Sequence, residues 1–295
     1  MGRYQSRLVG ASRIGILATF RSRGLKGGGP VDWREREANA AAVLRDCGQV
    51  LAARGNTILD EATAGAADIA AWRRFPEGEV YDPASHAQYF YHCHSAPAQT
   101  SCGERSEHGH FHLFLRAEGV PAGTTPLLLP ELAVANAPLP RQSAPLKRGG
   151  RDEVVHLVAI AIDGQGEPLR LFTTNRWVTG ETWYRADDVI RMLDRFQVEG
   201  AEPSAVLNRW LGAMVRLFKP EITVLLRNRD KTVMDWRWRR RTNVFEDPRL
   251  EITSSFEIDL DARLGMVESH SGEPAPRGGA RDRPGLPPMA EGWGV

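Results

Sequence analysis

The stretch HAQYFYHCHSAPAQTSCGERSEHGHFHLFLR, residues 86–116, contains six of the eight histidines in the chain. Its two densest parts are residues 91–94 and 108–112, where histidines alternate with other residues. A period of two is typical of a β-strand, because successive side chains point to opposite faces. The alternation therefore predicts strands over residues 88–94 and 108–116.

If these two strands pair as antiparallel neighbours, their histidines meet on one side of one sheet. Directly opposed Cβ atoms are then roughly 5 Å apart. A face built for a core would carry Val, Leu or Phe, whereas neutral imidazole is the commonest metal ligand among side chains. The sequence therefore predicts a site for iron, copper or zinc. The expected ligands are His92, His94, His108, His110 and His112.

Other side chains near the two strands extend this set. Glu107, and Glu104 before it, could supply a carboxylate ligand or a general base, and Cys102 a thiolate. Alternation points Cys93 away from its histidine neighbours, so we exclude it as a ligand. His156, in the next apolar run, has two interpretations: a ring on the same face as the cluster, or a packed core histidine.

Residues 108–114, HGHFHLF, also resemble the His-x-His-x-His-x-x signature of the histidine triad nucleotide hydrolases and transferases. The resemblance implies that His110 is a nucleophile supported by His108 and His112. Gly109 departs from the apolar residue expected there, and the nucleotide-binding half of that family has no counterpart upstream. A third interpretation is purely structural, with each imidazole hydrogen-bonded in a half-buried sheet. Each buried polar group left unsatisfied there costs about 1–3 kcal/mol.

Composition narrows the class of protein. A net charge of +1 gives no bulk attraction to nucleic acid or to a membrane, and 42% hydrophobic residues suffice for a large core. No apolar run approaches the roughly 18–20 residues of a membrane helix. Three unevenly spaced cysteines are not a disulfide framework, which favours a reducing cytoplasm. The sequence carries no signal for an oligomeric state.

The pattern of elements predicts an α+β fold, with a largely antiparallel sheet packed against N-terminal and C-terminal helices. The expected strands cover residues 88–94, 108–116, 154–162, 168–174 and 250–259. The expected helices cover residues 33–54, 61–73, 186–197 and 204–218, with another beginning at Pro220. Asp163-Gly164-Gln165-Gly166 is a strong hairpin turn between the third and fourth strands.

We expect a single α+β domain over residues 33–270. Residues 1–32 contain no acidic residue in their first thirty positions, which predicts a disordered basic extension or a targeting segment. Residues 117–150 hold six prolines and are expected to form an insertion without regular structure throughout. Eleven of residues 271–295 are Gly or Pro, which predicts a disordered tail.

A second candidate region, residues 173–183, concentrates hydrogen-bond donors and aromatic rings with little periodicity. Arg176 could grip a carboxylate or phosphate of a small-molecule substrate as a catalytic or binding group, with Asn175 orienting it. Trp177 and Trp183 could form the walls of a pocket. The alternative is a loop whose Trp residues fill the core while its polar residues cap turns.

Residues 227–241 form a basic run with two interleaved tryptophans, Trp236 and Trp238. Cations with stacking aromatics are used to bind single-stranded nucleic acid. A solvated helix face, with arginines complementing the helix dipole, explains the run equally simply. Nucleic acid is therefore not the expected partner.

Segments 81–94, 108–116 and 171–183 together resemble an uncharacterised bacterial protein family, a domain of unknown function. The resemblance covers about residues 35–260 and implies one coherent domain, but it brings no activity. The leading hypothesis is a metalloenzyme, either an oxidoreductase or a metal-assisted hydrolase. The alternatives are a histidine-nucleophile transferase and a non-catalytic metal-storage or nucleic-acid-binding module.

Overall fold

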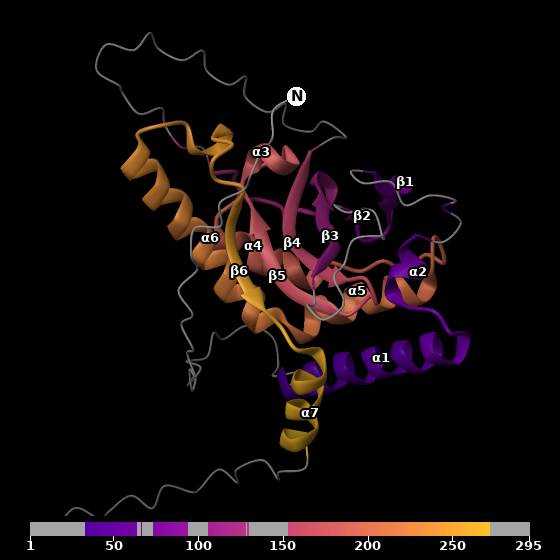
Figure 1. Ribbon diagram of the computed structural model, residues 1–295. Coiled ribbons are helices and arrows are strands. Elements are labelled where there is room, and N and C mark those ends of the chain that lie inside the picture. Colours follow the sequence, from indigo (N-terminus) through magenta and orange to yellow (C-terminus); the bar gives the residue numbers. More distant parts are fainter. Residues whose placement is uncertain are drawn as a thin grey trace, which may run out of the picture. The chain divides into compact units, whose positions relative to one another are not determined.

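The computed structural model describes residues 33–63, 66, 73–93, 106–127, 129 and 153–271. Within these ranges the chain is an α+β protein built on one six-stranded antiparallel sheet, with the strands in sequence order from β1 to β6 (Figure 1). The strands are β1 (Arg74–Tyr81), β2 (Ala87–Cys93), β3 (Glu107–Arg116), β4 (Val154–Asp163), β5 (Pro168–Thr174) and β6 (Ile252–Glu257). The predicted fold class is confirmed.

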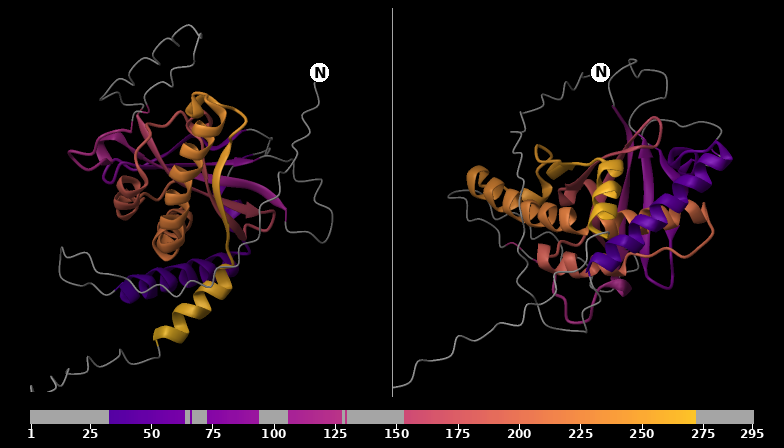
Figure 2. Two further views of the ribbon diagram at one scale, coloured as in Figure 1. Left: turned by 90° about the vertical axis from the view of Figure 1, so that its left-hand side faces the viewer. Right: turned by 90° about the horizontal axis from the view of Figure 1, so that it is seen from below.

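Seven α-helices and three short 3-10 helices complete the described ranges. The α-helices are α1 (Trp33–Arg54), α2 (Ile58–Ala62), α3 (Arg176–Thr179), α4 (Ala186–Met192), α5 (Ala205–Leu217), α6 (Lys219–Arg240) and α7 (Leu260–Ser271). The 3-10 helices are η1 (Ala117–Gly119), η2 (Leu193–Arg195) and η3 (Val244–Glu246). Helix α1 packs along α5 and α7, and α6 lies against β5 and β6 (Figures 1 and 2). None of the described helices combines the length and apolar character needed to cross a membrane.

The two faces of the sheet have different environments. Ile160 of β4 is paired with Leu171 of β5, and both belong to the large core that the helices complete. The next pair along, Ala159 and Phe172, points to the opposite face and forms a small cluster with Ala161. We call the first the helix face and the second the histidine face, because the candidate site lies on it.

Local sequence explains the main elements. The buried residues of α1 recur every three or four positions, from Ala40 and Leu44 to Cys47 and Leu51, which is the spacing of one helical stripe. The turn between β4 and β5 needs a glycine, since Gly166 has a φ of +82°. Asp163 closes the same turn by accepting from the backbone N–H groups of Gln165 and Glu167.

The structure differs from expectation at three places. Of the helix expected over 61–73, Glu61 and Ala62 form the end of α2 (Ile58–Ala62), and residues 64–65 and 67–72 lie outside the described ranges. Strand β1 follows at Arg74; it is an edge strand with an irregularity between Phe75 and Val80, which hides its alternation. Helix α7 lies where no helix was expected.

The described start of the proline-rich insertion packs on the rest of the domain. It includes η1, and Leu127 donates its backbone N–H to the carbonyl of Trp183 at 2.8 Å. Leu127 and Leu129 pack on a small cluster around Trp183 and Phe245. Residues 1–32, 130–152 and 272–295 lie outside the described ranges, as do the expectations placed on them.

Candidate metal centre

Three of the predicted histidine ligands meet on the histidine face. His92 of β2 is paired in register with His110 of β3, and His112 follows two residues later on the same face. One potential ligand atom from each of the three rings lies within 4.8 Å of the others. Strand pairing thus brings together imidazoles from separate parts of the sequence, as the alternation predicted.

Small residues on the neighbouring strand make room for the rings. Ala161 and Ala159 of β4 lie opposite His110 and His112 in the register, and both are fully buried. Phe172 of β5 presents its ring edge-on to His110, with the ring centroids 5.0 Å apart. Larger side chains at the two alanines would occupy the space into which the imidazoles lean.

The buried rings of His110 and His112 are each fixed by a partner on Nδ1. His110 Nδ1 lies 2.8 Å from a carboxylate oxygen of Glu107, and His112 Nδ1 lies 3.1 Å from His156 Nε2. The two Nε2 atoms of His110 and His112 consequently face each other at 2.9 Å. Outer hydrogen bonds of this kind orient histidines that bind metal.

A β-bulge decides which side chains of β3 join the site. The pairing with β4 shifts between Glu107 and Gly109, so the alternation is reset there. Glu107 therefore reaches His110, while the ring of His108 lies on the helix face, where its Nδ1 is 2.7 Å from the Tyr91 hydroxyl. The structure does not bring His108 to the group formed by His92, His110 and His112.

Gly109, which interrupts the histidine triad signature, is required by close packing. A Cβ atom at this position would lie 2.4 Å from the Tyr91 hydroxyl and 2.4 Å from the carbonyl oxygen of His92. Cys93 is on this side too, with its sulfur 3.9 Å from His108 Nε2. The glycine thus lets Tyr91 reach His108 beneath the site.

A second irregularity brings His156 to the histidine face. Leu113 is paired with Val158, but the next residue, Phe114, is paired with His156, so Leu157 is the extra residue of β4. Without this shift, strict alternation would place His156 beside Val158 on the helix face. His156 instead contacts His112, and its Nδ1 lies 3.4 Å from the Thr174 hydroxyl.

The buried electrostatics keep His112 and His156 neutral. Burial, together with nearby positive groups, lowers the pKa of His112 well below its ordinary value and that of His156 to about 3. Burial alone would raise the pKa of Glu107, but its hydrogen bond with His110 and the charge of Arg170 outweigh this and hold it at about 2. Neutral imidazoles with an ionised orienting carboxylate are the protonation states that metal binding needs.

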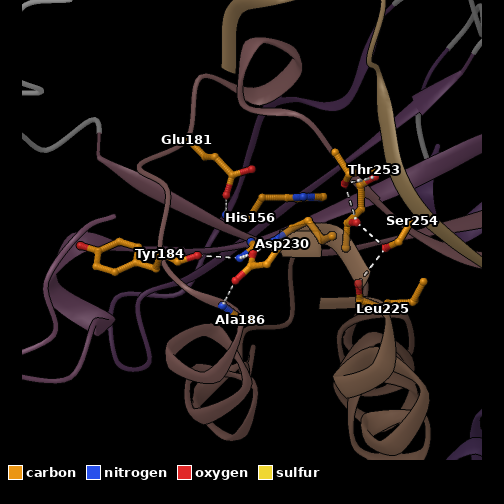
Figure 3. A network of polar contacts seen from close by, with 10 residues as sticks. His156, Glu181, Tyr184, Ala186, Leu225, Asp230, Thr253 and Ser254 are labelled. Atoms are coloured by element: carbon orange, nitrogen blue, oxygen red, sulfur yellow. Dashed lines mark hydrogen bonds and ion pairs between the residues drawn. The ribbon is translucent and has the colours of Figure 1, made fainter. Parts of the chain in front are cut away.

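Glu181 is a buried acid that the sequence analysis did not identify. Its carboxylate accepts from the backbone N–H of His156 at 3.0 Å, and Figure 3 shows it directed at that residue. Burial raises its pKa to about 7, although the charge of Arg229 opposes the shift. Arg229 is itself buried, where it donates to the carbonyl of Tyr184 and to Asp230. No local motif marks this network, because its members come from β4, α6 and the loop before α4.

The second candidate region, residues 173–183, has structural contacts. Asn175 caps α3 by accepting from the N–H of Arg176 and donates to the carbonyl of Val244. Arg176 pairs with Glu246, and Trp177 donates to the carbonyl of Leu250 at 2.8 Å. Trp183 is buried against Phe245. The structure does not bring these four residues to the histidine cluster, and their expected role in substrate binding stays a prediction.

Three other candidates, His94, Cys102 and Glu104, lie outside the described ranges. The basic run on α6 is divided between structure and surface: Arg229 and Arg237 are buried, and Trp236 donates to Asp247. Trp238 is the exposed aromatic of the run, with the guanidinium of Arg241 4.7 Å from its ring centroid.

A family model described as a domain of unknown function, DUF6969, matches residues 38–258. No curated protein and no solved structure matches the chain.

Proposed function

The chain belongs to the DUF6969 family, and we propose that it is a metalloenzyme whose ion is held by His92, His110 and His112. The observation that carries the proposal is the three-imidazole group, with ligand atoms within 4.8 Å of one another. In the two buried members, Nδ1 is hydrogen-bonded elsewhere and Nε2 is directed at the other ring.

The geometry suits a transition-metal ion. The Nε2 atoms of His110 and His112, which lie 2.9 Å apart, would be two of its ligands. His92, which is half-buried, would supply the third nitrogen. Three neutral nitrogen ligands without a carboxylate favour zinc, copper or iron over magnesium or calcium.

Neutral ligands leave the full charge of the ion available for chemistry. A divalent ion in such a site strongly acidifies a bound water or polarises a substrate oxygen. Iron or copper would instead support an oxidoreductase, and zinc a metal-assisted hydrolase. We assign Glu107 to orienting His110 rather than to general-base catalysis, because Arg170 and His110 already occupy its two oxygens.

The surroundings favour a small-molecule substrate with a negative charge. Arg74 is paired in register with His92, and its guanidinium lies 4.3 Å from the ring centroid of Phe90. Its side chain is 56% exposed and forms an ion pair with Glu79. A cation beside the three histidines suits an anionic group that also reaches the ion.

A histidine-nucleophile transferase is the second candidate, and the Glu107–His110 contact favours it. A carboxylate on Nδ1 increases the basicity of Nε2, which is the atom that would attack a phosphate. However, His108 lies on the other face of the sheet, bonded to Tyr91. The signature is therefore not assembled as that family would use it.

Metal content after reloading tests the proposal. The purified chain is stripped with a chelator, exposed separately to zinc, copper and anaerobic ferrous iron, desalted and analysed for bound metal. We expect about one ion per chain, lost in His110→Ala and His112→Ala and retained in His86→Ala, whose half-buried ring is bonded to Tyr81. A wild-type chain that binds none of the three ions contradicts the proposal. Nucleotide hydrolysis without metal that disappears in His110→Ala would support the transferase.

A further inference from the structure

A continuous line of hydrogen bonds runs from the site into the sheet. It passes from Glu107 to His110, His112, His156 and Thr174, through contacts of 2.8, 2.9, 3.1 and 3.4 Å. Each imidazole in the line uses both of its nitrogens. A neutral imidazole has one donor and one acceptor nitrogen, so fixing one ring fixes the next.

The ion pair at the start sets the direction of the line. The Glu107 carboxylate also accepts from Arg170, at 3.0 and 2.6 Å, and an ionised carboxylate can only accept. His110 must therefore carry a proton on Nδ1, and in a neutral His110 the Nε2 atom is then an acceptor. His112 then donates from Nε2 and accepts at Nδ1.

One donor and one acceptor nitrogen per neutral ring also fix the directions of the hydrogen bonds from His112 to Thr174. His156 donates from Nε2 to His112, so its own Nδ1 accepts. Its partner there is the Thr174 hydroxyl, which is buried and acts as the donor. In the metal-free protein, a single proton on His112 Nε2 thus holds together the two nitrogens that an ion would join.

We propose that His156 and Thr174 are positioning residues. When an ion binds to His112, the donor and the acceptor exchange roles in the hydrogen bonds from His112 to His156 and from His156 to Thr174. The inference rests on the proposed metal site. On binding, the Nε2 proton of His112 leaves for solvent, and His156 passes its Nε2 proton to His112 Nδ1. Thr174 passes its proton to His156 Nδ1 and takes up another from solvent.

The proton count balances. Each ring carries one proton before and after, and the hydroxyl is whole in both states, so one proton leaves at His112 and one enters at Thr174. A hydroxyl suits the end of such a line because it can donate in one state and accept in the other. His110 does not change, since Glu107 requires its Nδ1 proton in both states.

Imidazole nitrogen NMR of the full chain labelled with ¹⁵N-histidine tests the reversal directly. Without metal we expect the proton on Nδ1 of His110 and on Nε2 of His112 and His156. With zinc bound we expect it on Nδ1 of all three, while His108, on the other face, keeps its tautomer. A zinc-bound chain in which His156 keeps its Nε2 proton overturns the inference. A chain that binds no zinc contradicts the metal site instead, and its metal-free tautomers still test the direction of the line.

Variants at the end of the line give a second readout. Thr174→Val removes the partner of His156 Nδ1 in both states, but a buried N–H without an acceptor costs more than a bare nitrogen without a donor, so we expect about tenfold weaker zinc binding. Thr174→Ser keeps a hydroxyl and should restore most of the affinity. Thr173→Val is the matched control, because Thr173 bonds with Thr253 and Ser254 instead. Equal zinc affinity in Thr174→Val and wild type would contradict the positioning role of Thr174.

Discussion

His108 and His110 are separated by one residue on β3, yet their rings lie on opposite faces of the sheet, against Tyr91 and Phe172 respectively. The bulge between Glu107 and Gly109 causes this separation. The bulge places the carboxylate of Glu107 on the histidine face and removes His108, the third histidine of β3, from that face.

This separation predicts unequal effects of two alanine variants. His110→Ala removes a ligand and should abolish stoichiometric metal binding. His108→Ala removes contacts with Tyr91 and Cys93 on the helix face, so metal binding should stay within a few-fold of wild type. Zinc titration of both variants measures the difference. Equal loss in the two variants would place His108 in the site and contradict the bulge assignment.

Gly109 should tolerate no side chain. Gly109→Ala places a Cβ 2.4 Å from both a hydroxyl and a carbonyl oxygen, and the local shift should cost about 1–3 kcal/mol of unfolding free energy. Chemical denaturation measures this cost. Gly48→Ala is the control, because nothing lies within 4 Å of the added Cβ in α1, and alanine there should be neutral or stabilising. Wild-type stability in Gly109→Ala would show that the packing of Gly109 against Tyr91 and His92 can relax at no cost.

Asn175 should act on stability rather than on metal. Asn175→Ala removes the cap of α3 and the 2.6 Å hydrogen bond to Val244, a loss of about 1–2 kcal/mol. Thermal and chemical unfolding measure this loss, with the exposed Asn228→Ala as the control. Zinc affinity should be unchanged in both variants. A large loss of metal binding in Asn175→Ala would link residues 173–183 to the site after all.

Glu181 should make stability depend on pH in a defined direction. Its pKa rises from an ordinary value near 4.5 to about 7 on folding, so the folded state binds more protons between these values. Its contribution is therefore fully present below about pH 4.5 and declines as pH rises to about 7, by at most about 1.4 kcal/mol per pH unit.

Comparison with Glu181→Gln isolates this dependence from those of His156 and Glu107, whose lowered pKa values act in the opposite direction at acid pH. We expect the variant to gain stability relative to wild type as pH rises from 5 to 8, measured by urea unfolding. A free-energy difference that is constant across this range would mean that Glu181 is ionised throughout.

The strands that carry the site and most of the helices follow from sequence periodicity. The alternation around His92 and His110 predicted two neighbouring strands, and the apolar stripe of α5 predicted its helix. Strand β1 was not predicted, because Pro76 and Gly78 in an irregular edge strand look like a turn.

The parts of the site that the sequence did not predict depend on departures from regular pairing or on distant segments. Two bulges reverse the faces of His108 and His156, and a bulge leaves no mark in a period of two. Glu181 reaches His156 only through the packing of the loop before α4 on β4. Such contacts exist only once the sheet has formed.

X-ray absorption spectroscopy of the zinc-loaded chain tests the central claim most directly. It counts the nitrogen and sulfur neighbours of the ion and recognises imidazole rings by their outer-shell scattering. We predict three imidazole nitrogens at about 2.0–2.1 Å, with oxygen in the remaining positions. A spectrum with sulfur ligands, or with fewer than three imidazoles, would contradict a centre built from His92, His110 and His112.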